Sequence, residues 1–256
     1  MKIVPRKRFG QNFLTDLSVI NEIIRIISPS EDDLMIEIGP GTGAMTKYLL
    51  EKLPHLSVIE IDRNLVSYLK KTFSGKLSVY EGDVLSFDFS KLKREGKKLR
   101  IVGNLPYNIS TPLLFHLAKF ANKVEDQHFM LQKEVVERMV AQPKSKNYGR
   151  LSVMLQWRYL MEMVLSVPPD AFNPKPKVDS AIVRMIPIKK PLFCVHEDLE
   201  KVVTAAFTQR RKIIRNNLSK IFTENDLIDS GINPQARAEE LSLEQFVDLA
   251  NKLRMT

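Results

Sequence analysis

Four consecutive residues, Asn104, Leu105, Pro106 and Tyr107, offer the groups needed to hold a flat base that carries an amino group. The carboxamide oxygen of Asn104 is a hydrogen-bond acceptor, and Pro106 favours an extended backbone that would aim the Leu105 carbonyl outward as a second acceptor. Tyr107 supplies an aromatic face on which a base can stack. Two acceptors beside a stacking ring match the exocyclic amine of adenine. The alternative is an ordinary strand-to-helix turn, in which the asparagine caps and the Pro-Tyr pair packs.

The chemistry that these groups predict is attack by the amine nitrogen on an electrophile. The lone pair of that nitrogen is delocalised into the ring, so the amine is a poor nucleophile. Acceptors on its protons would favour a tetrahedral nitrogen and would stabilise the positive charge that grows during attack. No general base is needed before the step, because the proton can leave afterwards.

A glycine-rich turn between an expected strand and an expected helix predicts a nucleotide cofactor. The apolar residues 34–38 form the strand, Gly39 and Gly41 fall in the turn, and the helix is expected to run to about residue 53. Glycines allow the backbone to approach a ligand closely. Glu60 ends the next expected strand, about 20 residues on, where an acid can bind a ribose diol. Nicotinamide cofactors and S-adenosylmethionine share both features, so the turn alone leaves the choice open.

The later strand ends favour S-adenosylmethionine. Successive expected strands end at Gly39, Glu60, Asp83 and Asn104, so their polar groups should line one edge of a parallel sheet. Asp83 could accept a hydrogen bond from the adenine amino group of the cofactor, although an Asp at this place can also be a plain turn residue. We find no His or Tyr-Lys pair that would serve hydride transfer. Glu37 suits the cationic methionine end of the cofactor.

Length and composition indicate one main domain and a small second one. The chain has 256 residues, of which 44% are hydrophobic, and a short linker separates an α/β domain at 1–187 from a helical domain at 192–256. A formal net charge of +9 suggests a polyanionic partner. The single cysteine, Cys194, excludes an internal disulfide and fits a cytoplasmic location. The four histidines have no ligand spacing, so we expect no metal site, and no apolar run is long enough to cross a membrane.

Hydrophobic periodicity predicts the remaining elements of the α/β domain. We expect a helix from Asp16 to just before Pro29, a strand at 129–132, a helix at 133–140 and a final pair of strands at 160–167 and 180–186. The loop between the last two strands carries four prolines and one large apolar side chain, Phe172. Phe172 is either a buried anchor of this loop or a second aromatic wall for an extruded base.

The helical C-terminal part contains a basic segment suited to RNA phosphates. Residues 207–218 are expected to form a helix on which Arg211, Lys212 and Arg215 lie close together. Residues 209–220 contain five basic residues and no acid. This imbalance favours a phosphate-contacting face over a merely solvated one.

Taken in chain order, these motifs resemble those of the rRNA adenine dimethyltransferases, and in particular their bacterial small-subunit branch. The matching segments span nearly the whole chain: 11–14 (Gln-Asn-Phe-Leu), 37–43 (Glu-Ile-Gly-Pro-Gly-Thr-Gly), 60–62 (Glu-Ile-Asp), 82–84 (Gly-Asp-Val), 104–111 (Asn-Leu-Pro-Tyr-Asn-Ile-Ser-Thr), 172–180 (Phe-Asn-Pro-Lys-Pro-Lys-Val-Asp-Ser) and 209–212 (Gln-Arg-Arg-Lys). The combination is specific, whereas a glycine-rich turn alone is not.

The resemblance implies an α/β, Rossmann-like methyltransferase domain that uses S-adenosylmethionine, followed by a small all-helical domain. It implies methyl transfer to the N6 amines of two adjacent adenosines near the 3′ end of small-subunit rRNA, by a monomer that acts on the small ribosomal subunit and in its biogenesis. The residues from Asn104 to Tyr107 and Phe172 would carry catalysis. The cofactor would be held by Asn12, Leu14, Gly39, Gly41, Glu60, Asp83 and Asn104.

Methylating one nitrogen twice requires space for a methyl group where a hydrogen-bonded proton stood. Gly103, the small residue beside Asn104, could leave that space.

Three alternatives share parts of the pattern. A large-subunit rRNA methyltransferase of the macrolide-resistance type has the same cofactor and Asn-Leu/Ile-Pro-Tyr motifs, but the basic segment 209–218 resembles the small-subunit branch. A DNA adenine methyltransferase would need a separate target-recognition domain, which we do not find. A ribosome assembly factor without catalysis is disfavoured by the intact Gly39, Glu60 and Asn104, although binding could be a second role.

Overall fold

The structure is a computed structural model of the chain and describes residues 11–92 and 94–254. The basic N-terminal segment that the sequence shows, with Lys2, Arg6, Lys7 and Arg8, therefore lies outside the described residues. Within these limits the chain forms two compact units, one made of residues 11–136 and 161–187 and the other of residues 137–160 and 188–254. Because 137–160 group with the C-terminal segment, the second unit is not contiguous in sequence. The division of the domains between residues 187 and 192 stays a prediction.

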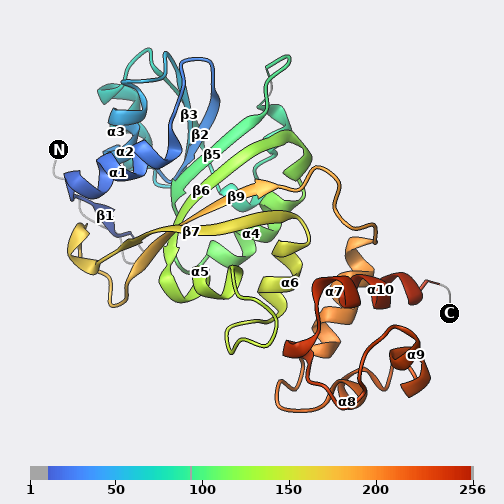
Figure 1. Cartoon of the computed structure of the whole chain (residues 1–256). Helices are drawn as coiled ribbons and strands as arrows, with labels where there is room; N and C mark the ends of the chain where they lie inside the picture. The colour runs from blue at the N-terminus through green and yellow to red at the C-terminus, as the bar shows by residue number, and fades with distance from the viewer. Residues whose placement is uncertain (1–10, 93, 255–256) are drawn as a thin grey trace. The chain divides into compact units, whose positions relative to one another are not determined.

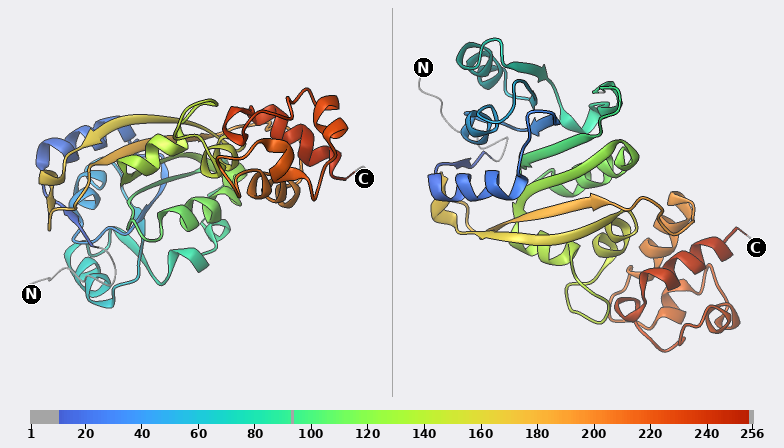
Figure 2. Two further views of the ribbon diagram at one scale, coloured as in Figure 1. Left: turned by 90° about the horizontal axis from the view of Figure 1, so that it is seen from below. Right: turned by 45° about the horizontal axis from the view of Figure 1, so that its top comes forward.

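The first unit is built on a sheet with the strand order β4-β3-β2-β5-β6-β9-β7 (Figure 1). The strands from β4 to β6 run parallel, and β9 runs antiparallel to β6. β3 is buried along its whole length, as expected for a parallel strand covered on both faces. Figure 2 shows the twist of the sheet from two further sides. The bounds are β2 (Leu34–Ile38), β3 (Leu56–Glu60), β4 (Leu77–Glu81), β5 (Leu99–Asn104), β6 (Val124–Gln132), β7 (Tyr159–Val167) and β9 (Ser180–Pro187).

Two further strands form a small separate ladder. β1 (Phe13–Leu14) pairs antiparallel with β8 (Phe172–Asn173). This ladder joins the segment near the N-terminus to the proline-rich loop between β7 and β9.

Helices cover both faces of the large sheet. Parallel crossovers are right-handed. The helices that connect β2 to β3 and β3 to β4 therefore lie on one face of the sheet, and the helix that connects β5 to β6 lies on the other face. The bounds are α1 (Leu17–Ile27), α2 (Ala44–Leu49), α3 (Arg63–Thr72), α4 (Ser110–Ala118) and α5 (Lys133–Met139). α2 ends earlier than predicted, since the residues after Leu49 form a turn.

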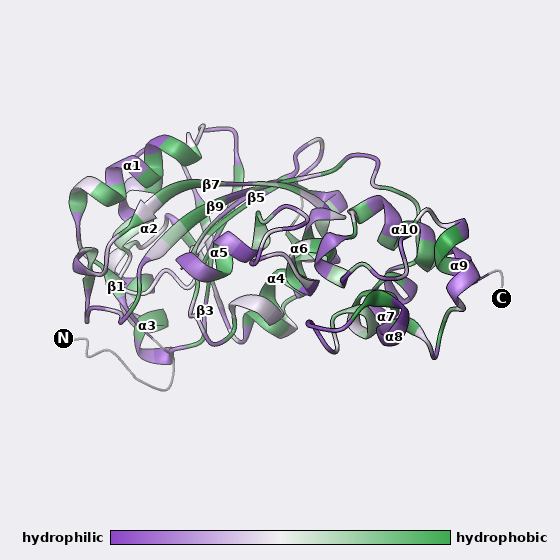
Figure 3. Ribbon diagram, turned by 60° about the horizontal axis from the view of Figure 1, so that its bottom comes forward, coloured by the Kyte–Doolittle hydropathy of each residue, from purple (hydrophilic) through white to green (hydrophobic). Residues whose placement is uncertain are grey.

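Helix α1 shows how the sequence specifies one of these elements. The Asp16 side chain accepts hydrogen bonds from the amides of Ser18 and Val19, which caps the first turn. Three isoleucines at helical spacing, Ile20, Ile23 and Ile27, are buried. Figure 3 shows the resulting alternation of hydrophobic and hydrophilic colouring along α1. The predicted helix between Asp16 and Pro29 is thus confirmed.

The carboxyl ends of β2, β3, β4 and β5 meet at one edge of the sheet. The chain first adds β3 and β4 on one side of β2 and then adds β5 and β6 on the other side. The winding direction therefore reverses between β2 and β5, and open α/β sheets bind their ligands in the crevice at such a reversal.

Gly103 serves the packing of this edge. It lies opposite Ile38 of β2, and a Cβ added to it would stand 2.6 Å from the Ile38 carbonyl oxygen. That oxygen belongs to the backbone of a central strand, so it cannot move aside without separating the strands. The prediction that Gly103 leaves space for a second methyl group is wrong, because Ile38 occupies the space.

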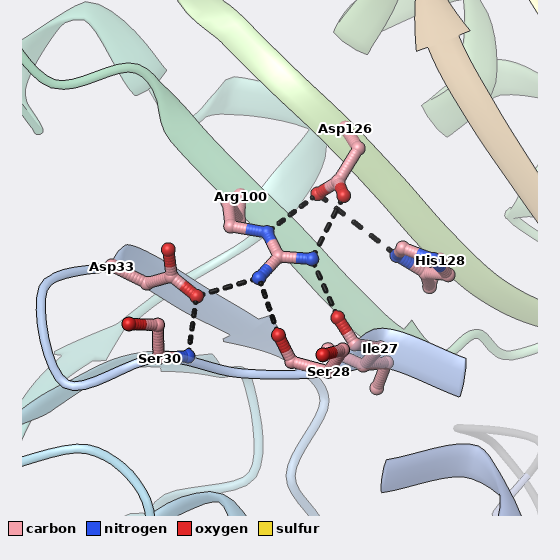
Figure 4. Close-up of polar contacts among 7 residues, drawn as sticks. All are labelled: Ile27, Ser28, Ser30, Asp33, Arg100, Asp126 and His128. Carbon is pink, nitrogen blue, oxygen red and sulfur yellow. Dashed lines mark hydrogen bonds and ion pairs between the residues drawn. The ribbon is translucent and has the colours of Figure 1, made fainter. Parts of the chain in front are cut away.

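A partly buried network of charges ties α1 to the opposite edge of the sheet (Figure 4). Arg100 of β5 donates through Nε and Nη2 to the carboxylate of Asp126 at 2.9 and 2.8 Å, and through Nη1 to Asp33 at 2.5 Å. It also donates to the carbonyl oxygens of Ile27 and Ser28, which the end of α1 leaves without helical partners. The Arg100 side chain is only 13% exposed. The network therefore fixes the end of α1 to both β5 and β6.

The second unit is mainly helical. α7 packs against α6, α8 and α10, and the rings of Phe207 and Phe246 lie 5.8 Å apart in its core. No helix within the described residues has the length and apolar character of a membrane span. The bounds are α6 (Arg150–Gln156), α7 (His196–Ala206), α8 (Ile214–Leu218), α9 (Glu224–Asp229) and α10 (Leu243–Lys252).

The predicted helix over 207–218 is wrong in its first half. α7 ends at Ala206, and residues 207–213 form turns before α8 begins. Asn217 donates to the carbonyl oxygens of Ala206 and Gln209, and the amide of Ile214 donates to Ala236. These long-range hydrogen bonds replace the helical ones. Lys212 and its neighbour Arg211 consequently lie in a turn.

Candidate active site

A cavity of about 260 Å³ lies at the carboxyl edge of the sheet, within the first unit. Every residue predicted to bind the cofactor lines it, and so do the residues from Asn104 to Tyr107. Asn104 and Asn12 meet there although they are 92 positions apart in the chain. The lining consists of residues 11–14, 37–42, 44–45, 59–61, 82–84 and 104–109.

The glycine turn after β2 has the backbone conformation that its sequence predicts. Gly39 and Gly41 have φ angles of 65° and 59°, in the left-handed region that favours glycine. At Gly41 an added Cβ would also lie 3.0 Å from the ring of Phe13. The missing side chain at Gly41 therefore leaves room for the Phe13 ring, and both glycines line the cavity.

Glu60 is a buried carboxylate that three backbone amides hold in place. Its Oε1 accepts from Ile61 and Asp62, both at 2.9 Å, and its Oε2 accepts from Gly41 at 3.3 Å. Burial raises the pKa of Glu60, and these amide hydrogen bonds oppose the rise. A carboxylate has about four lone-pair sites, so Oε2 can accept a further donor such as a ribose hydroxyl.

Glu37 is a second buried acid at the cavity, and only 1% of it is exposed. Its Oε2 accepts from the Thr46 hydroxyl at 2.6 Å. Burial raises the pKa of Glu37 to about 7, an effect that the Thr46 hydrogen bond opposes and the nearby Glu60 strengthens. A cation in the cavity would favour the carboxylate form and lower this pKa.

The side chain of Asn104 is oriented by the segment near the N-terminus. Its Nδ2 donates to the carbonyl oxygen of Asn12 at 3.0 Å, which leaves Oδ1 as the acceptor at the cavity. The amide of Leu105 donates to Met130 at 3.1 Å, and no residue within 11–92 and 94–254 donates to the Leu105 carbonyl oxygen. Both acceptors predicted for an amine are therefore available.

Tyr107 is held by a contact with the last part of the sheet. Its hydroxyl lies 2.7 Å from the Oγ of Ser180, which begins β9 and is fully buried. Burial raises the pKa of Tyr107, and the hydrogen bond with Ser180 opposes the rise. The phenol therefore stays protonated at neutral pH, and its ring is suited to stacking rather than to proton abstraction.

Phe172 and Asp83 each make a structural contact that is independent of the role predicted for them. Phe172 pairs with Leu14 across the β1–β8 ladder, is 3% exposed and packs in the core, so it anchors the loop here. Its stacking on a base stays a prediction, since the ring does not line the cavity. Asp83 does line the cavity, and its Oδ1 caps the following turn by accepting from Leu85 at 2.9 Å. Its contact with the cofactor adenine also stays a prediction.

Four residues with a part in this site were not predicted from the sequence. Ile61 and Val84 line the cavity with apolar side chains, and each directly follows a strand-end acid, a position that could have drawn attention to it. Thr46 and Ser180 gave no such signal, because each acts through a contact that only the fold creates.

The three basic residues predicted to bind RNA lie in the second unit. Arg215 forms an ion pair with Glu224 at 2.9 Å. Arg211 and Lys212 are exposed and form no ion pair with any residue that the structure describes. Acids from elsewhere in the chain thus balance part of the segment that lacks acids of its own.

Comparison with known proteins identifies the family. The model described as ribosomal RNA adenine dimethylase matches residues 4–254. The chain belongs to this family. A ribosomal RNA small subunit methyltransferase A from Herminiimonas arsenicoxydans is 63% identical to this dimethylase over 255 residues, which cover 99% of this chain and 100% of the relative. Another from Janthinobacterium sp. (strain Marseille) is 61% identical with the same coverage.

Solved structures share the fold of the dimethylase. A dimethyladenosine transferase from Plasmodium falciparum has a TM-score of 0.79 and 27% identity, covering 95% of this chain and 98% of that one. The 23S rRNA methyltransferase ErmE has a TM-score of 0.71 and 27% identity, covering 95% of this chain and 100% of that one. The predicted α/β, Rossmann-like methyltransferase fold is therefore confirmed.

S-adenosylmethionine is the methyl donor of the dimethylase, and the residues around the cavity fit it. Glu37 is a buried acid with no cationic partner among the described residues, which suits a ligand that carries positive charge. Glu60 retains an acceptor site for a diol, and Ile61 and Val84 offer apolar surface to a flat base. No other class of cofactor is required to account for these groups.

Proposed function

We propose that this dimethylase transfers methyl groups to the N6 amines of two adjacent adenosines near the 3′ end of small-subunit rRNA, with a role in small-subunit biogenesis. The observation that carries the proposal is the orientation of Asn104. Because its Nδ2 is engaged by the carbonyl oxygen of Asn12, its Oδ1 accepts at the cavity beside the Tyr107 ring. That arrangement suits an amine on an aromatic base, and curated relatives above 60% identity carry a small-subunit name.

In this proposal the protein activates the amine by hydrogen bonding. The bound cofactor supplies a methyl group made electrophilic by a positively charged sulfur. Oδ1 of Asn104 and the Leu105 carbonyl oxygen accept from the amine and stabilise the charge that grows on its nitrogen. Pro106 keeps the backbone extended at this point, and Tyr107 stacks on the base with Phe172 as the further proposed wall. The proton leaves after methyl transfer, so no side chain need act as a base.

We assign the cofactor contacts to groups around the cavity. Glu60 accepts from the ribose diol, Asp83 accepts from the adenine amine, and Gly39 and Gly41 present backbone. Asn12 and Leu14, together with Asn104, close the cavity from the side of β1. In this proposal the enzyme acts as a monomer and in the cytoplasm.

The rRNA itself would be held in part by the second unit. Arg211 and Lys212, exposed and without acidic partners, are the proposed phosphate contacts. Arg215 contributes less in this proposal, because Glu224 already neutralises it.

The experiment that tests the function offers the enzyme three substrates: small subunits, large subunits and naked rRNA. Mass spectrometry of digested rRNA should find N6,N6-dimethyladenosine at two adjacent positions of small-subunit rRNA. Methylation of large subunits alone would favour a large-subunit rRNA methyltransferase of the macrolide-resistance type. Binding to small subunits without methylation would favour an assembly factor.

A further inference from the structure

The loop that connects α5 to α6 is joined to the basic turn that connects α7 to α8. Arg210, in the turn, donates through Nη2 to the carbonyl oxygen of Lys146, in the loop. Its Nε donates to the carboxylate of Glu239 at 2.9 Å. The backbone carbonyl of Glu239 accepts from the amide of Lys144 at 2.7 Å. Three segments of the second unit, distant in sequence, therefore meet at one guanidinium group and one glutamate.

Further contacts hold the loop in one conformation. Tyr148, at its end, is 1% exposed, and its ring lies 6.4 Å from that of Phe207. The amide of Tyr148 donates to Ser145, and the amide of Ser145 donates to Gln142. Lys144 has a φ angle of 72°, a conformation that residues with side chains adopt only where surrounding contacts maintain it. These contacts thus order the backbone from which the side chains of the loop extend.

The side chains that it presents are cations without partners. Lys144 and Lys146 are exposed and form no ion pair with any described residue, and residues 141–149 contain no acid. Basic residues nearby differ in this respect, since Arg150 pairs with Glu200.

The turn also contains both paired and unpaired cations. Arg210 is engaged by Glu239, whereas its neighbours Arg211 and Lys212 are exposed and without acidic partners among the described residues. Because Arg210 binds the backbone of Lys146, the two pairs of unpaired cations lie on either side of one contact.

We propose that Lys144 and Lys146 form, with Arg211 and Lys212, one phosphate-binding surface for the rRNA, and that Arg210 and Glu239 position the loop. This proposal rests on the proposed rRNA substrate and extends its binding surface to a loop outside the basic segment. Cations without an acidic ion-pair partner contact a polyanion without breaking an ion pair, and ordering the loop backbone in advance reduces the entropy cost of binding. Arg210 acts here as a positioning residue, through Lys146, and not as a phosphate contact.

The first test replaces both lysines of the loop in the full-length enzyme. Binding to purified small ribosomal subunits is measured over a range of salt concentrations. K144A/K146A should flatten the plot of log affinity against log salt by about 0.7–0.9 for each phosphate that the variant no longer neutralises. The matched control, K189A/K190A, removes two exposed lysines of the linker in the same unit and should leave the slope steeper than K144A/K146A does. An unchanged slope in K144A/K146A overturns the proposal.

The second test separates positioning from charge. Glu239→Ala removes a negative charge, so simple electrostatics predicts tighter binding to RNA. If Glu239 instead holds Arg210 and the loop, E239A should bind more weakly, and Glu239→Gln, which keeps an acceptor for Arg210, should bind nearly as the wild type does. Binding by E239A that equals or exceeds the wild type overturns the positioning role.

A cycle of variants tests Arg210 itself. If Arg210 acts only through the loop, adding R210A to K144A/K146A should not flatten the salt dependence further. A further decrease of about 0.7–0.9 in slope would make Arg210 a phosphate contact of its own. Thermal melting of each variant identifies any that fails to fold. If a variant at Arg210 or Glu239 fails to fold, K144A/K146A, which changes only two exposed side chains, still tests the proposal. A wild type that does not bind small subunits would overturn the proposed function, whereas full binding by K144A/K146A would overturn only this inference.

Discussion

Replacing Glu37 by Gln should change how the stability of the dimethylase depends on pH. Burial raises the pKa of Glu37 from its ordinary 4.5 to about 7 in the folded protein. Below 4.5 the carboxyl is protonated in both the folded and the unfolded chain, so the raised pKa has no effect on stability there. Above about 7 it is charged in both states, and the folded state carries the full cost of the buried charge. The stability of the wild type relative to E37Q therefore falls as the pH rises through this window.

The size of the effect follows from the size of the pKa change. Each tenfold change in the protonation constant corresponds to about 1.4 kcal/mol, so a rise from 4.5 to about 7 corresponds to roughly 3 kcal/mol. Glu37 is 1% exposed, so solvent screens little of this cost. The Thr46 hydroxyl can donate to the Gln carbonyl as it does to the carboxylate, so E37Q keeps the hydrogen bond of the wild type.

Urea unfolding of the cofactor-free proteins at about pH 5 and about pH 8 measures the effect, because the difference between wild type and variant cancels the titration of the groups that do not interact with Glu37. The gain in stability of E37Q over the wild type should be larger at the higher pH. The exposed Glu51→Gln is the matched control and should show no such change. If E37Q and the wild type differ by the same amount at both pH values, burial does not raise the pKa of Glu37 and the reasoning fails. Calorimetry should show the opposite ranking for S-adenosylmethionine, which E37Q binds more weakly at the higher pH.

Substitutions of Asn104, Gly103 and Arg100 should change the methyl-transfer rate or the stability of the enzyme. Asn104→Ala should lower single-turnover methyl transfer by about 10²–10³, and a loss below tenfold would remove Asn104 from the proposed acceptor pair. Gly103→Val should fail to fold or melt at a much lower temperature, since its side chain meets the Ile38 carbonyl oxygen, and a normal melting temperature would contradict that contact. Arg100→Met should lower the free energy of unfolding by about 3–5 kcal/mol, because Asp126 would remain buried without its partner. Urea denaturation decides this, and a change below about 1 kcal/mol would mean that the network in Figure 4 contributes little.

The fold of the first unit was accessible from sequence because its signals are local. Apolar strands that end in Gly39, Glu60, Asp83 and Asn104 predict polar groups at one sheet edge, since parallel strands point the same way. The capped helix from Asp16 was equally clear, because its cap and its buried face are both set by nearest neighbours in the chain. The sequence by itself therefore determined the position of the cavity and most of its polar lining.

The tertiary structure decided what these groups can do. The Asn104 amide is oriented by Asn12, and the Tyr107 hydroxyl is held by Ser180, contacts that span 92 and 73 positions of the chain. Likewise, the raised pKa of Glu37 comes from burial, which depends on everything packed around it.

In the basic segment 209–220 of the second unit, too, the sequence determines some properties and the tertiary structure decides others. Its composition indicates a charged surface, but the sequence pattern predicts one helix where the chain makes a turn. Contacts with residues such as Ala236 and Glu239 determine both that turn and which cations remain unpaired. A helical sequence pattern is read from side chains three or four positions apart, whereas Ala236 and Glu239 lie more than 20 positions from their partners. Only the folded chain brings them together, and for that reason no local pattern could have revealed the loop with Lys144 and Lys146 as part of the same surface.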